Sequence, residues 1–424
     1  PLDGLTLPQT TTYAVNALPL DRQTAIAKAL SNPDVLPDHW VEPGTVAELQ
    51  QLIDYCQQKR VGLLPCGNGS KLAWGGLAKP VEMVVSSRKL DRIIDHAVAD
   101  LTVTVEAGVR LQDLQGVLNA HRQFLPLDPL YGDQATMGSI MATGNAGSWQ
   151  QRYGGVRDLI LGFSFVRWDG KLAKAGGRVV KNVAGYDLMK LFTGSYGTLG
   201  FISQMTFRLY PLPPISQTLV LSGSAENLSQ AAQTLRRSGL TPTAAELISQ
   251  ALAQKLGLGD QLSLILRFQN LQEVVQAQAD QITQLAQAMT LSWQIRANQA
   301  EQELWQGLKT AMIEANSALL CKIGVLPEQS VNFLQQAPGL AHLQLGTGLG
   351  YLQAPQIDSR ELRQQRIICQ NYGGYLTLLD APHEVKSTED VWGYTGNGLE
   401  LMTRLKQQFD PQGIFSPGRF VGGL

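Results

Sequence analysis

Residues 63–76, "LLPCGNGSKLAWGG", decide how the first part of this chain folds. The short apolar run "LLP" predicts a buried strand, and four glycines and one asparagine follow it in the same stretch. Glycine has no Cβ, so its backbone can approach another group closely. The stretch therefore indicates a strand followed by a loop whose backbone lies against a ligand or against other backbone.

The segments on either side place this loop between two strands. Upstream, "VEPGTVAELQQLIDYCQQKRVG" predicts a helix that begins with a capping box of Thr45 and Glu48 and ends at Gly62. Downstream, "VEMVVSS" (residues 81–87) predicts the next strand. We therefore expect a strand, the glycine loop and a second strand.

Two nucleotide-binding motifs do not fit this loop. A dinucleotide fingerprint needs a glycine where Leu72 stands and a helix after it, and a Walker loop needs Gly-Lys-Ser/Thr where the chain has Ser70-Lys71. The successive N–H groups from Gly67 to Lys71 can still form a nest for a phosphate, with the Ser70 hydroxyl as a further donor. For an isolated loop of this kind, a tight connection that binds nothing is the favoured alternative.

Other glycine-rich stretches change that balance. Residues 138–200 hold 13 of the 42 glycines, about double the average density. They include "TMGSIMATGNAGSWQQRYGGVRDLILG", which begins at Thr136, and "GSYGTLGFI", which begins at Gly194. Three such stretches in one part of the chain indicate a long ligand with a diphosphate in its middle.

Composition excludes several classes of protein. The 34 Lys and Arg residues balance 35 Asp and Glu residues, which argues against a nucleic-acid partner. The four cysteines form no CxxC pair and no cluster with histidine, so we expect no metal site and no iron–sulfur cluster in this chain. The apolar runs are far shorter than the roughly 20 residues that cross a bilayer. We expect a cytoplasmic protein without membrane insertion of its own; any membrane association would go through partner subunits.

A change in amino-acid composition predicts a domain boundary. The chain's 424 residues predict at least two domains, and prolines cluster near "FRLYPLPP", which ends at Pro214. Beyond it, strands such as "SLILRF" alternate with long glutamine-rich helices in a βαβ-like order. We predict an α+β protein with a ligand-binding domain at residues 1–214 (core from about 41), a cap domain at 215–365 and a C-terminal segment at 366–424 that packs back on the first domain.

Several blocks in this order carry a family resemblance. They are "PCGNGSK", "VEAGV", "PLDP", "TMGSIMATGNAG", "RYGGVRDLILG", "KNVAGYDLMKLFTGSYGTLGFI" and "FDPQGIFSPG". Together they resemble the FAD-binding fold shared by vanillyl-alcohol oxidase and p-cresol methylhydroxylase. Within that superfamily the chain is similar to the glycolate dehydrogenase (glycolate oxidase) group, in particular to the smaller of its flavin-binding subunits.

The resemblance implies FAD bound between two subdomains of a PCMH-type domain, followed by a cap domain with a mixed or antiparallel sheet. The residues that the family motifs assign to the cofactor are Pro65, Gly67, Asn68, Gly69, Ser70, Lys71, Thr136, Met137, Gly138, Ser139, Thr143, Gly144, Asn145, Ser148, Tyr153, Gly154, Gly200, Phe201 and Ile202. Gly67–Ser70 would hold the diphosphate. Since the loop has no histidine for covalent attachment, and Cys66 is at the wrong position, we expect non-covalent FAD.

The chemistry expected of the cap is missing from this sequence. Catalytic relatives carry a His-x-Gly-Asp-Gly-Asn-x-His stretch, whereas "QLGTGLGY" has Gln344 and Tyr351 in place of the histidines, Thr347 in place of the aspartate and Leu349 in place of the asparagine. Neither Gln nor Tyr accepts a proton readily near neutral pH, and a metal would lose its nitrogen ligands. The catalytic residues are therefore unknown.

The remaining candidates for chemistry are single residues. His342 and His383 could each reach a flavin, although a lone histidine is more often structural. Lys181, Tyr186 and Asp187 match a family block near the flavin, although Asp187 could simply favour the start of a helix.

The sequence leaves three functions open. The resemblance favours an FAD-binding subunit of a glycolate dehydrogenase complex, which oxidises glycolate to glyoxylate with a catalytic flavoprotein and an iron–sulfur subunit as partners. The chain offers electrons no outlet of its own, which fits this interpretation. The alternatives are a free-standing FAD-dependent 2-hydroxy-acid (D-lactate or glycolate) dehydrogenase and a flavin-free structural subunit. The glutamine-rich helices could form a partner interface or be solvated.

Overall fold

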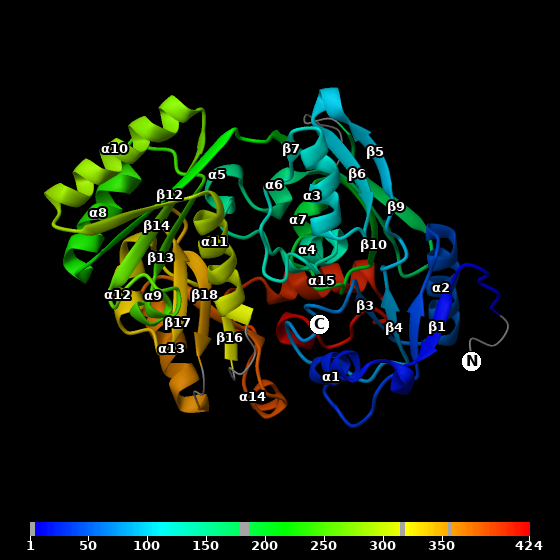
Figure 1. Cartoon of the computed structure of the whole chain (residues 1–424). Helices are drawn as coiled ribbons and strands as arrows, with labels where there is room; N and C mark the ends of the chain where they lie inside the picture. The colour runs from blue at the N-terminus through cyan, green and yellow to red at the C-terminus, as the bar shows by residue number, and fades with distance from the viewer. Residues whose placement is uncertain (1–4, 179–185, 314–318, 355–357) are drawn as a thin grey trace. The chain divides into compact units, whose positions relative to one another are not determined.

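The computed structural model describes residues 5–178, 186–313, 319–354 and 358–424. The chain divides into two compact units, each of which is described by itself (Figure 1). The first unit comprises Pro1–Ala146, Gly155–Pro211 and Lys386–Leu424, and the second comprises Gly147–Gly154 and Leu212–Val385. The domain limits given by the sequence stay a prediction.

The glycine loop belongs to a mainly parallel sheet of the first unit. Strands β2 (His39–Glu42), β4 (Met83–Ser86) and β3 (Leu63–Cys66) are parallel neighbours, and β1 (Thr11–Ala14) pairs antiparallel with β2. Both faces of this sheet are buried: Leu63 and Val85 contact one apolar cluster, and Leu64 and Val84 contact another. Two buried faces explain why "LLP" is apolar without alternation.

Helix α2 (Val46–Lys59) connects β2 to β3 in the predicted place. Its Thr45 hydroxyl accepts the Glu48 N–H at 3.1 Å, but the Glu48 carboxylate accepts the N–H groups of Gln9 and Gly44, so only half of the capping box forms. The prediction that Gly62 ends the helix is wrong. Arg60 takes the left-handed conformation (φ 55°), which closes the helix two residues earlier.

A second, antiparallel sheet completes the first unit. Its strand order is β5 (Ile93–Ala97), β6 (Thr102–Glu106), β10 (Phe201–Arg208), β8 (Ile160–Val166) and β9 (Leu172–Gly176). The core on one face of this sheet is formed with helices α3 (Leu111–Ala120), α4 (Met137–Thr143), α6 (Val156–Leu159) and α7 (Met189–Phe192). The alternation in "TVTVE" is explained by this one-sided core, since Val103 and Val105 point into it.

The end of the chain returns to the first sheet. After helix α15 (Leu399–Phe409), residue Phe415 forms a parallel bridge with Leu63 of β3. The Lys406 ammonium donates to the carbonyls of Thr198 and Phe415 at 2.8 and 2.9 Å and to the Asp410 carboxylate at 2.7 Å. These bonds tie the C-terminal segment to strand β3 and to the loop before β10.

The second unit is built on an antiparallel eight-stranded sheet. Its order is β15 (Ser292–Ala297), β12 (Ile215–Gly223), β14 (Leu262–Asn270), β13 (Ala244–Ile248), β17 (Leu340–Gln344), β18 (Leu349–Ala354), β16 (Leu319–Gly324) and β19 (Tyr375–Asp380). The βαβ-like order therefore produces no neighbouring parallel strands here. Strand β14 lies between β12 and β13, and β18 lies between β16 and β17, so each half is a split βαβ arrangement.

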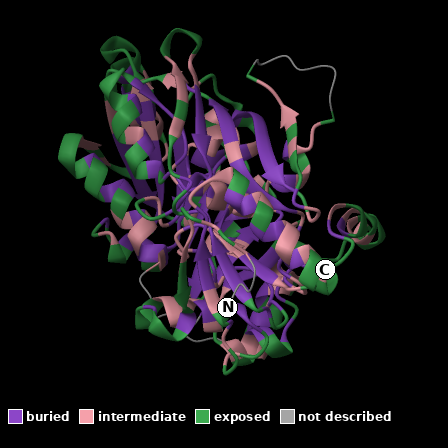
Figure 2. Ribbon diagram, turned by 90° about the vertical axis from the view of Figure 1, so that its right-hand side faces the viewer, coloured by how far each residue is buried: buried purple, intermediate pink, exposed green. Residues whose placement is uncertain are grey.

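Helices cover this sheet with apolar stripes. Helix α10 (Gln272–Ala288), for example, buries Val275, Ala279, Ile282 and Ala286, while its glutamines stay on the other side. The other helices of this unit are α5 (Gln150–Tyr153), α8 (Ala225–Arg237), α9 (Gln250–Lys255), α11 (Asn298–Ile313), α12 (Ser330–Gln335) and α13 (Ser359–Asn371). Figure 2 shows the buried strands and the exposed outer turns of the helices.

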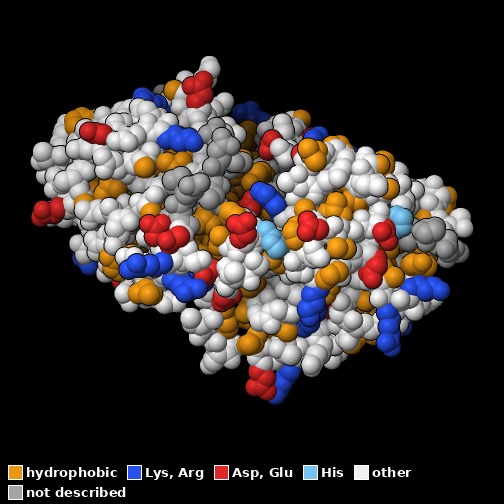
Figure 3. Space-filling view, turned by 90° about the horizontal axis from the view of Figure 1, so that it is seen from below, with side chains coloured by type: hydrophobic (Ala, Val, Ile, Leu, Met, Phe, Trp, Pro, Cys, Tyr) orange, Lys and Arg blue, Asp and Glu red, His pale blue; other side chains and the backbone are white. Residues whose placement is uncertain are grey.

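The remaining elements are short or lie at the edges. They are α1 (Leu20–Ala29), β7 (Gln123–Phe124), β11 (Tyr210–Pro211), α14 (His383–Thr388) and the 3-10 turns Val15–Ala17, Val98–Asp100, Pro327–Gln329 and Val421–Gly423. None of the helices in the described residues is long and apolar enough to span a membrane. On the face drawn in Figure 3, acidic and basic side chains are interspersed, in keeping with the balanced charge.

Candidate functional site: a glycine-lined cavity

The loop after β3 rests on the start of helix α4. A Cβ added at Gly67 would lie 2.0 Å from the Thr136 hydroxyl, so only glycine fits there. Thr136 is the N-cap of α4, where its hydroxyl accepts the Ser139 N–H at 3.3 Å. The close approach of the loop to this N-cap explains why glycine and threonine are needed at these two positions.

The backbone beyond Gly67 forms a turn with unused donors. Leu72 and Trp74 donate their N–H groups to the carbonyls of Gly69 and Lys71 at 3.0 and 3.1 Å. In the described part of the chain, the N–H groups of residues 68–71 have no hydrogen-bond partner. Successive free N–H groups of this kind form an anion-binding concavity.

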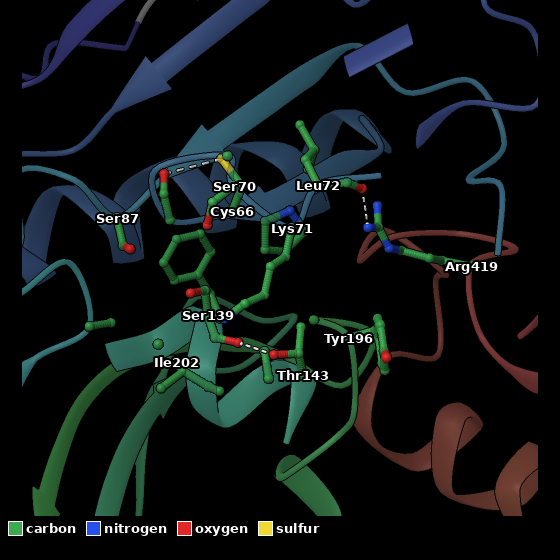
Figure 4. Close-up of a pocket in the computed structure, with 18 of the residues that line it drawn as sticks. Cys66, Ser70, Lys71, Leu72, Ser87, Ser139, Thr143, Tyr196, Ile202 and Arg419 are labelled. Atoms are coloured by element: carbon green, nitrogen blue, oxygen red, sulfur yellow. Dashed lines mark hydrogen bonds between the residues drawn. The ribbon is translucent and has the colours of Figure 1, made fainter. Parts of the chain in front are cut away.

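This turn borders a cavity that is open at its mouth (Figure 4). Its wall comes from the end of β3, the glycine loop, helix α4, the start of β10 and the C-terminal segment. Gly69 lies in the wall at φ +89°, and a Cβ there would meet no protein atom within 4 Å.

Lys71 is the clearest sign of a ligand in this cavity. Its side chain is buried (5% exposed), and within the described residues its ammonium has no hydrogen-bond acceptor. The Lys71 nitrogen lies 5.7 Å from the centre of the Trp74 ring, which compensates only a small part of the lost hydration. Burial lowers the pKa of Lys71 from 10.5 to about 7. An anion in the cavity would supply the missing partner.

Two cations hold the turn from the C-terminal side. The Arg419 guanidinium donates to the carbonyls of Leu72 and Trp74, the latter at 2.7 Å, and Lys386 donates to the carbonyl of Ala73 at 2.6 Å. These bonds occupy three successive carbonyls of the turn. The Nε and Nη1 atoms of Arg419 are buried without a partner among the described residues, and Arg419 also lines the cavity. Burial lowers the pKa of Arg419 to about 10.

Cys66 lies in the cavity wall as a neutral thiol. Its sulfur contacts the Gly67 carbonyl at 3.5 Å, and burial raises the pKa of the thiol to about 12. A thiol with so high a pKa is a poor nucleophile. Burial therefore disfavours the thiolate of Cys66, which is the form that would act as a nucleophile.

The structure brings most of the predicted cofactor residues to this one cavity. Those that line it are Pro65, Gly67, Gly69, Ser70, Lys71, Gly138, Ser139, Thr143, Gly200, Phe201 and Ile202. Sequence reasoning missed Leu72, Ser87, Ala107, Ala142, Tyr196, Gly197 and Arg419 in the wall, and it discounted Cys66. Tyr196 lies in the quoted "GSYG" and Arg419 follows the quoted "FSPG", so a wider search around those blocks could have found them.

Other predicted residues lie outside the wall of the cavity. Met137 belongs to the apolar core, and the Asn145 amide oxygen accepts the Leu130 N–H at 2.8 Å. Gly144 caps the end of α4 with φ +61°, and Asn68 and Thr136 are not among the residues that line the cavity. Ser148, Tyr153 and Gly154 belong to the second unit.

The block around residue 186 is only partly described. Lys181 lies outside the described residues. Tyr186 is 91% exposed, and Asp187 forms ion pairs with Arg157 and, at 3.5 Å, with Lys190 at the start of α7. These contacts give Asp187 a structural role near that helix.

The segment that replaces the catalytic motif is a β-turn of the second unit, between β17 and β18. The Gln344 amide donates to the Gly147 carbonyl at 2.9 Å and accepts the Thr347 hydroxyl at 2.8 Å. The Gly346 N–H donates to the side chain of Gln151 at 3.0 Å. Gln344, which replaces a histidine, therefore binds segment 147–154, whereas Thr347, which replaces the aspartate, binds Gln344.

The histidines and acids in the described residues form no metal centre. Among the described residues, no three His, Cys, Asp or Glu side chains gather at metal-binding distance. His342 is buried and hydrogen-bonded to Glu246, and His383 begins helix α14.

Comparison with known proteins identifies the class of the chain. Residues 37–176 match the family described as "FAD binding domain", and residues 392–420 match "FAD linked oxidases, C-terminal domain". The structure is similar to that of p-cresol methylhydroxylase, with a TM-score of 0.74 over 94% of this chain and 92% of that chain at 14% identity. This likeness confirms the fold class.

Curated relatives include glycolate oxidase subunits and a D-lactate dehydrogenase. Glycolate oxidase subunit GlcE of Escherichia coli is 28% identical over 338 residues, 78% of this chain and 85% of that protein. The mitochondrial D-lactate dehydrogenase (cytochrome) of Arabidopsis thaliana is 25% identical, covering 94% of this chain and 75% of that protein. Subunit GlcD of Bacillus subtilis is 32% identical over 200 residues, but the match spans only 42% of that protein's length.

As the sequence predicts, residues 37–176 therefore form an FAD-binding domain, the chain has the fold of p-cresol methylhydroxylase, and its curated relatives include oxidase subunits and dehydrogenases. The match to the FAD binding domain family confirms the prediction that FAD is the cofactor.

Proposed function

We propose that this chain is the FAD-binding subunit of a glycolate dehydrogenase complex. The observation that carries the proposal is the cavity with a buried, unpartnered Lys71 ammonium beside the N–H groups of residues 68–71, which have no partner in the described part of the chain. A buried cation without a counterion is costly, and a diphosphate supplies the charge and the acceptors that it lacks. The similarity to GlcE over 85% of that protein supports the choice of subunit.

The residues in the wall fit FAD chemically. Gly67, Gly69 and Ser70 would hold the diphosphate together with Lys71, while Ser139, Thr143 and the 200–202 segment would contact the rest of the cofactor. Since Cys66 is a protonated thiol and no histidine is among the described lining residues, FAD would be bound without a covalent bond. When bound, FAD supplies hydride acceptance.

The second unit supports an accessory role. Gln344 donates to the Gly147 carbonyl and accepts the Thr347 hydroxyl, and neither side chain provides a base of the strength a histidine would. Oxidation of glycolate to glyoxylate would then require a catalytic flavoprotein partner, and electrons would leave through an iron–sulfur subunit. The complex would be cytoplasmic, with any membrane contact made by partners. The domain limits at about 214 and 365 belong to this proposal.

A second candidate is a free-standing FAD-dependent 2-hydroxy-acid dehydrogenase. The match to the D-lactate dehydrogenase over 94% of this chain favours it. In that case the base would have to come from a residue outside the replaced motif.

An anaerobic reduction assay separates the two candidates. The isolated chain, loaded with FAD, is mixed with glycolate and in a second experiment with D-lactate, and the flavin absorbance is followed. We expect no bleaching with the isolated chain and bleaching once the partner subunits are added. Bleaching by the isolated chain would refute the accessory role and establish the second candidate.

A further inference from the structure

Strand β15 is an unpaired edge of the eight-stranded sheet. It comes first in the strand order and, among the described strands, pairs only with β12. Two of its side chains, Trp293 and Ile295, are 40% and 46% exposed. All seven tryptophans of the chain are described, and Trp293 alone among them is exposed. An exposed edge strand with large apolar side chains is a template for pairing with another strand.

The two exposed side chains share one face of the strand. In the register with β12, Arg296 is opposite Thr218, which accepts the Trp305 indole N–H of helix α11 at 2.9 Å. Since directly opposed residues point to the same face of a sheet, helix α11 lies on the face that carries Arg296. Trp293 and Ile295 point to the other face, because successive side chains alternate along a strand. Helix α11 therefore does not cover them.

The other edge of this sheet does not offer the same surface. In β19, residues 376–379 are buried, and only Tyr375 at the start of the strand is exposed. Pairing of β15 with β19 of another copy would leave further edges open and produce a row of molecules, whereas pairing of β15 with β15 closes after two copies. The distribution of exposed apolar side chains favours the closed pair.

The surroundings of β15 are nearly free of charge. Within residues 281–300 the single charged residue is Arg296. The second half of helix α10, which leads into β15, exposes Gln281, Gln284 and Gln287. In a two-fold dimer each surface meets its own copy, so a strongly charged surface would repel itself. An apolar, nearly uncharged edge therefore suits a second copy of this chain.

One antiparallel register makes this edge complementary to itself. When Gln294 lies on the two-fold axis, Trp293 of one copy is opposite Ile295 of the other, and this apolar pair occurs twice. The two Gln294 side chains meet at the axis, where one amide can donate to the other. Arg296 is then opposite Ser292, so the two arginines stay about 14 Å apart along the strands.

We propose that two copies of this chain pair through β15, as antiparallel strands related by a two-fold axis at Gln294. The backbone N–H and C=O groups on the outer side of each strand bond across the axis. The two contacts between Trp293 and Ile295 bury the apolar surface that the single chain exposes. The inference rests on the second unit alone and goes beyond the proposed function, which concerns the flavin cavity.

Sedimentation velocity of the full-length chain tests the pairing directly. Because pairing follows mass action, we expect the sedimentation coefficient to rise toward that of a dimer between about 1 and 100 µM protein. A chain that remains monomeric at about 100 µM would overturn the inference, whichever other polypeptide covers the edge. This measurement needs no variant to fold.

Introduced cysteines test the position of the axis. Gln294→Cys places two thiols on directly opposed residues, whose Cα atoms are about 4.5–5.5 Å apart and within reach of a disulfide. The matched control is Ser292→Cys, whose two copies lie about 14 Å apart and cannot be bridged. After mild oxidation we expect a covalent dimer of Gln294→Cys, but not of Ser292→Cys or of the unsubstituted chain. A sedimenting dimer that Gln294→Cys does not cross-link would contradict this interface.

A charge placed on the edge should separate the two copies. Trp293→Lys should weaken dimerisation about 30-fold or more, because a tryptophan at the centre of an interface commonly dominates the binding energy. Leu172→Lys is the control, since Leu172 is also exposed (39%) but lies on β9, an edge strand of the first unit. Thermal unfolding verifies that both variants are folded. Unchanged dimerisation in a folded Trp293→Lys would refute the pairing.

The same samples keep the two proposals apart. Their visible spectra report FAD content, and sedimentation reports the pairing of the chains. A yellow protein that stays monomeric refutes only this inference. A colourless protein that forms the cross-linked dimer refutes the flavin-subunit proposal and supports the pairing through β15.

Discussion

Replacing Lys71 by methionine should weaken FAD binding and at the same time stabilise the FAD-free protein. Methionine keeps an unbranched apolar stem in the wall and removes the ammonium that has no partner in the described residues. If Lys71 only filled space, the two properties would move together. Opposite changes are expected only if the charge is held for a ligand.

The magnitude follows from the lowered pKa. Burial brings the pKa of Lys71 from 10.5 to about 7, and since each pKa unit corresponds to 1.36 kcal/mol, the ammonium is disfavoured by roughly 5 kcal/mol at most. An unfolded chain binds the proton up to pH 10.5, so the stability of the FAD-free protein should rise with pH between about 7 and 10.5. Lys71→Met should remove this slope and raise the melting temperature at pH 7.

FAD binding should depend on pH in the opposite sense. The phosphates favour the charged ammonium, so above the free-protein pKa of about 7 each binding event takes up a proton. The affinity should fall by up to about tenfold per pH unit between pH 7 and 9 and be nearly constant below pH 6. At pH 6, Lys71→Met should cost roughly 10- to 100-fold in affinity, the usual value of a hydrogen bond to a charged group.

The assay is a titration of the FAD-free protein with FAD from pH 6 to 9, followed by flavin fluorescence, together with thermal unfolding. Lys59→Met, an exposed lysine at the end of α2, is the matched control and should leave both quantities unchanged. An unchanged FAD affinity in Lys71→Met, with the pH dependence intact, would refute the assignment of Lys71 to the phosphate site.

The remaining predictions concern the loop, the C-terminal segment and the flavin linkage. Gly69→Val should leave the protein folded but without FAD, because the valine side chain would enter the cavity from a left-handed position. Gly257→Val is the control: Gly257 has φ +67° and also has nothing within 4 Å of an added Cβ, so this variant carries similar backbone strain but should retain FAD. FAD retention by Gly69→Val would contradict the site. Asp410→Ala leaves the buried Lys406 ammonium without its carboxylate and should cost about 3–5 kcal/mol in unfolding free energy, measured by urea denaturation; a loss below about 1 kcal/mol would show that the pair does not anchor the C-terminal segment. Acid precipitation should release all FAD into the supernatant, and a yellow pellet would disprove non-covalent binding. Because burial raises the pKa of the Cys66 thiol to about 12, Cys66 should stay unmodified by iodoacetamide at pH 8 while the protein is folded.

Local patterns were sufficient for much of the fold. The glycine loop between strands, helix α2 with its Thr45 cap and the alternating strand β6 all depend on neighbours within a few residues, and the structure has them where the sequence places them. The end of α2 was misplaced because Arg60 takes a left-handed conformation that its residue type does not favour.

The sequence by itself indicated the class of ligand through the family resemblance that its ordered glycine blocks carry, since glycine is the usual residue where backbone must approach another group closely. Only the tertiary structure decided which charges are left without partners. Arg419 reaches Leu72 across 347 positions, and Glu246 reaches His342 across 96, on strands whose register no local pattern specifies. Lys71 and His342 can be read from the sequence, but it does not show that Lys71 Nζ and His342 Nε2 lack hydrogen-bond partners among the described residues. That property follows from burial, which arises when distant segments pack together.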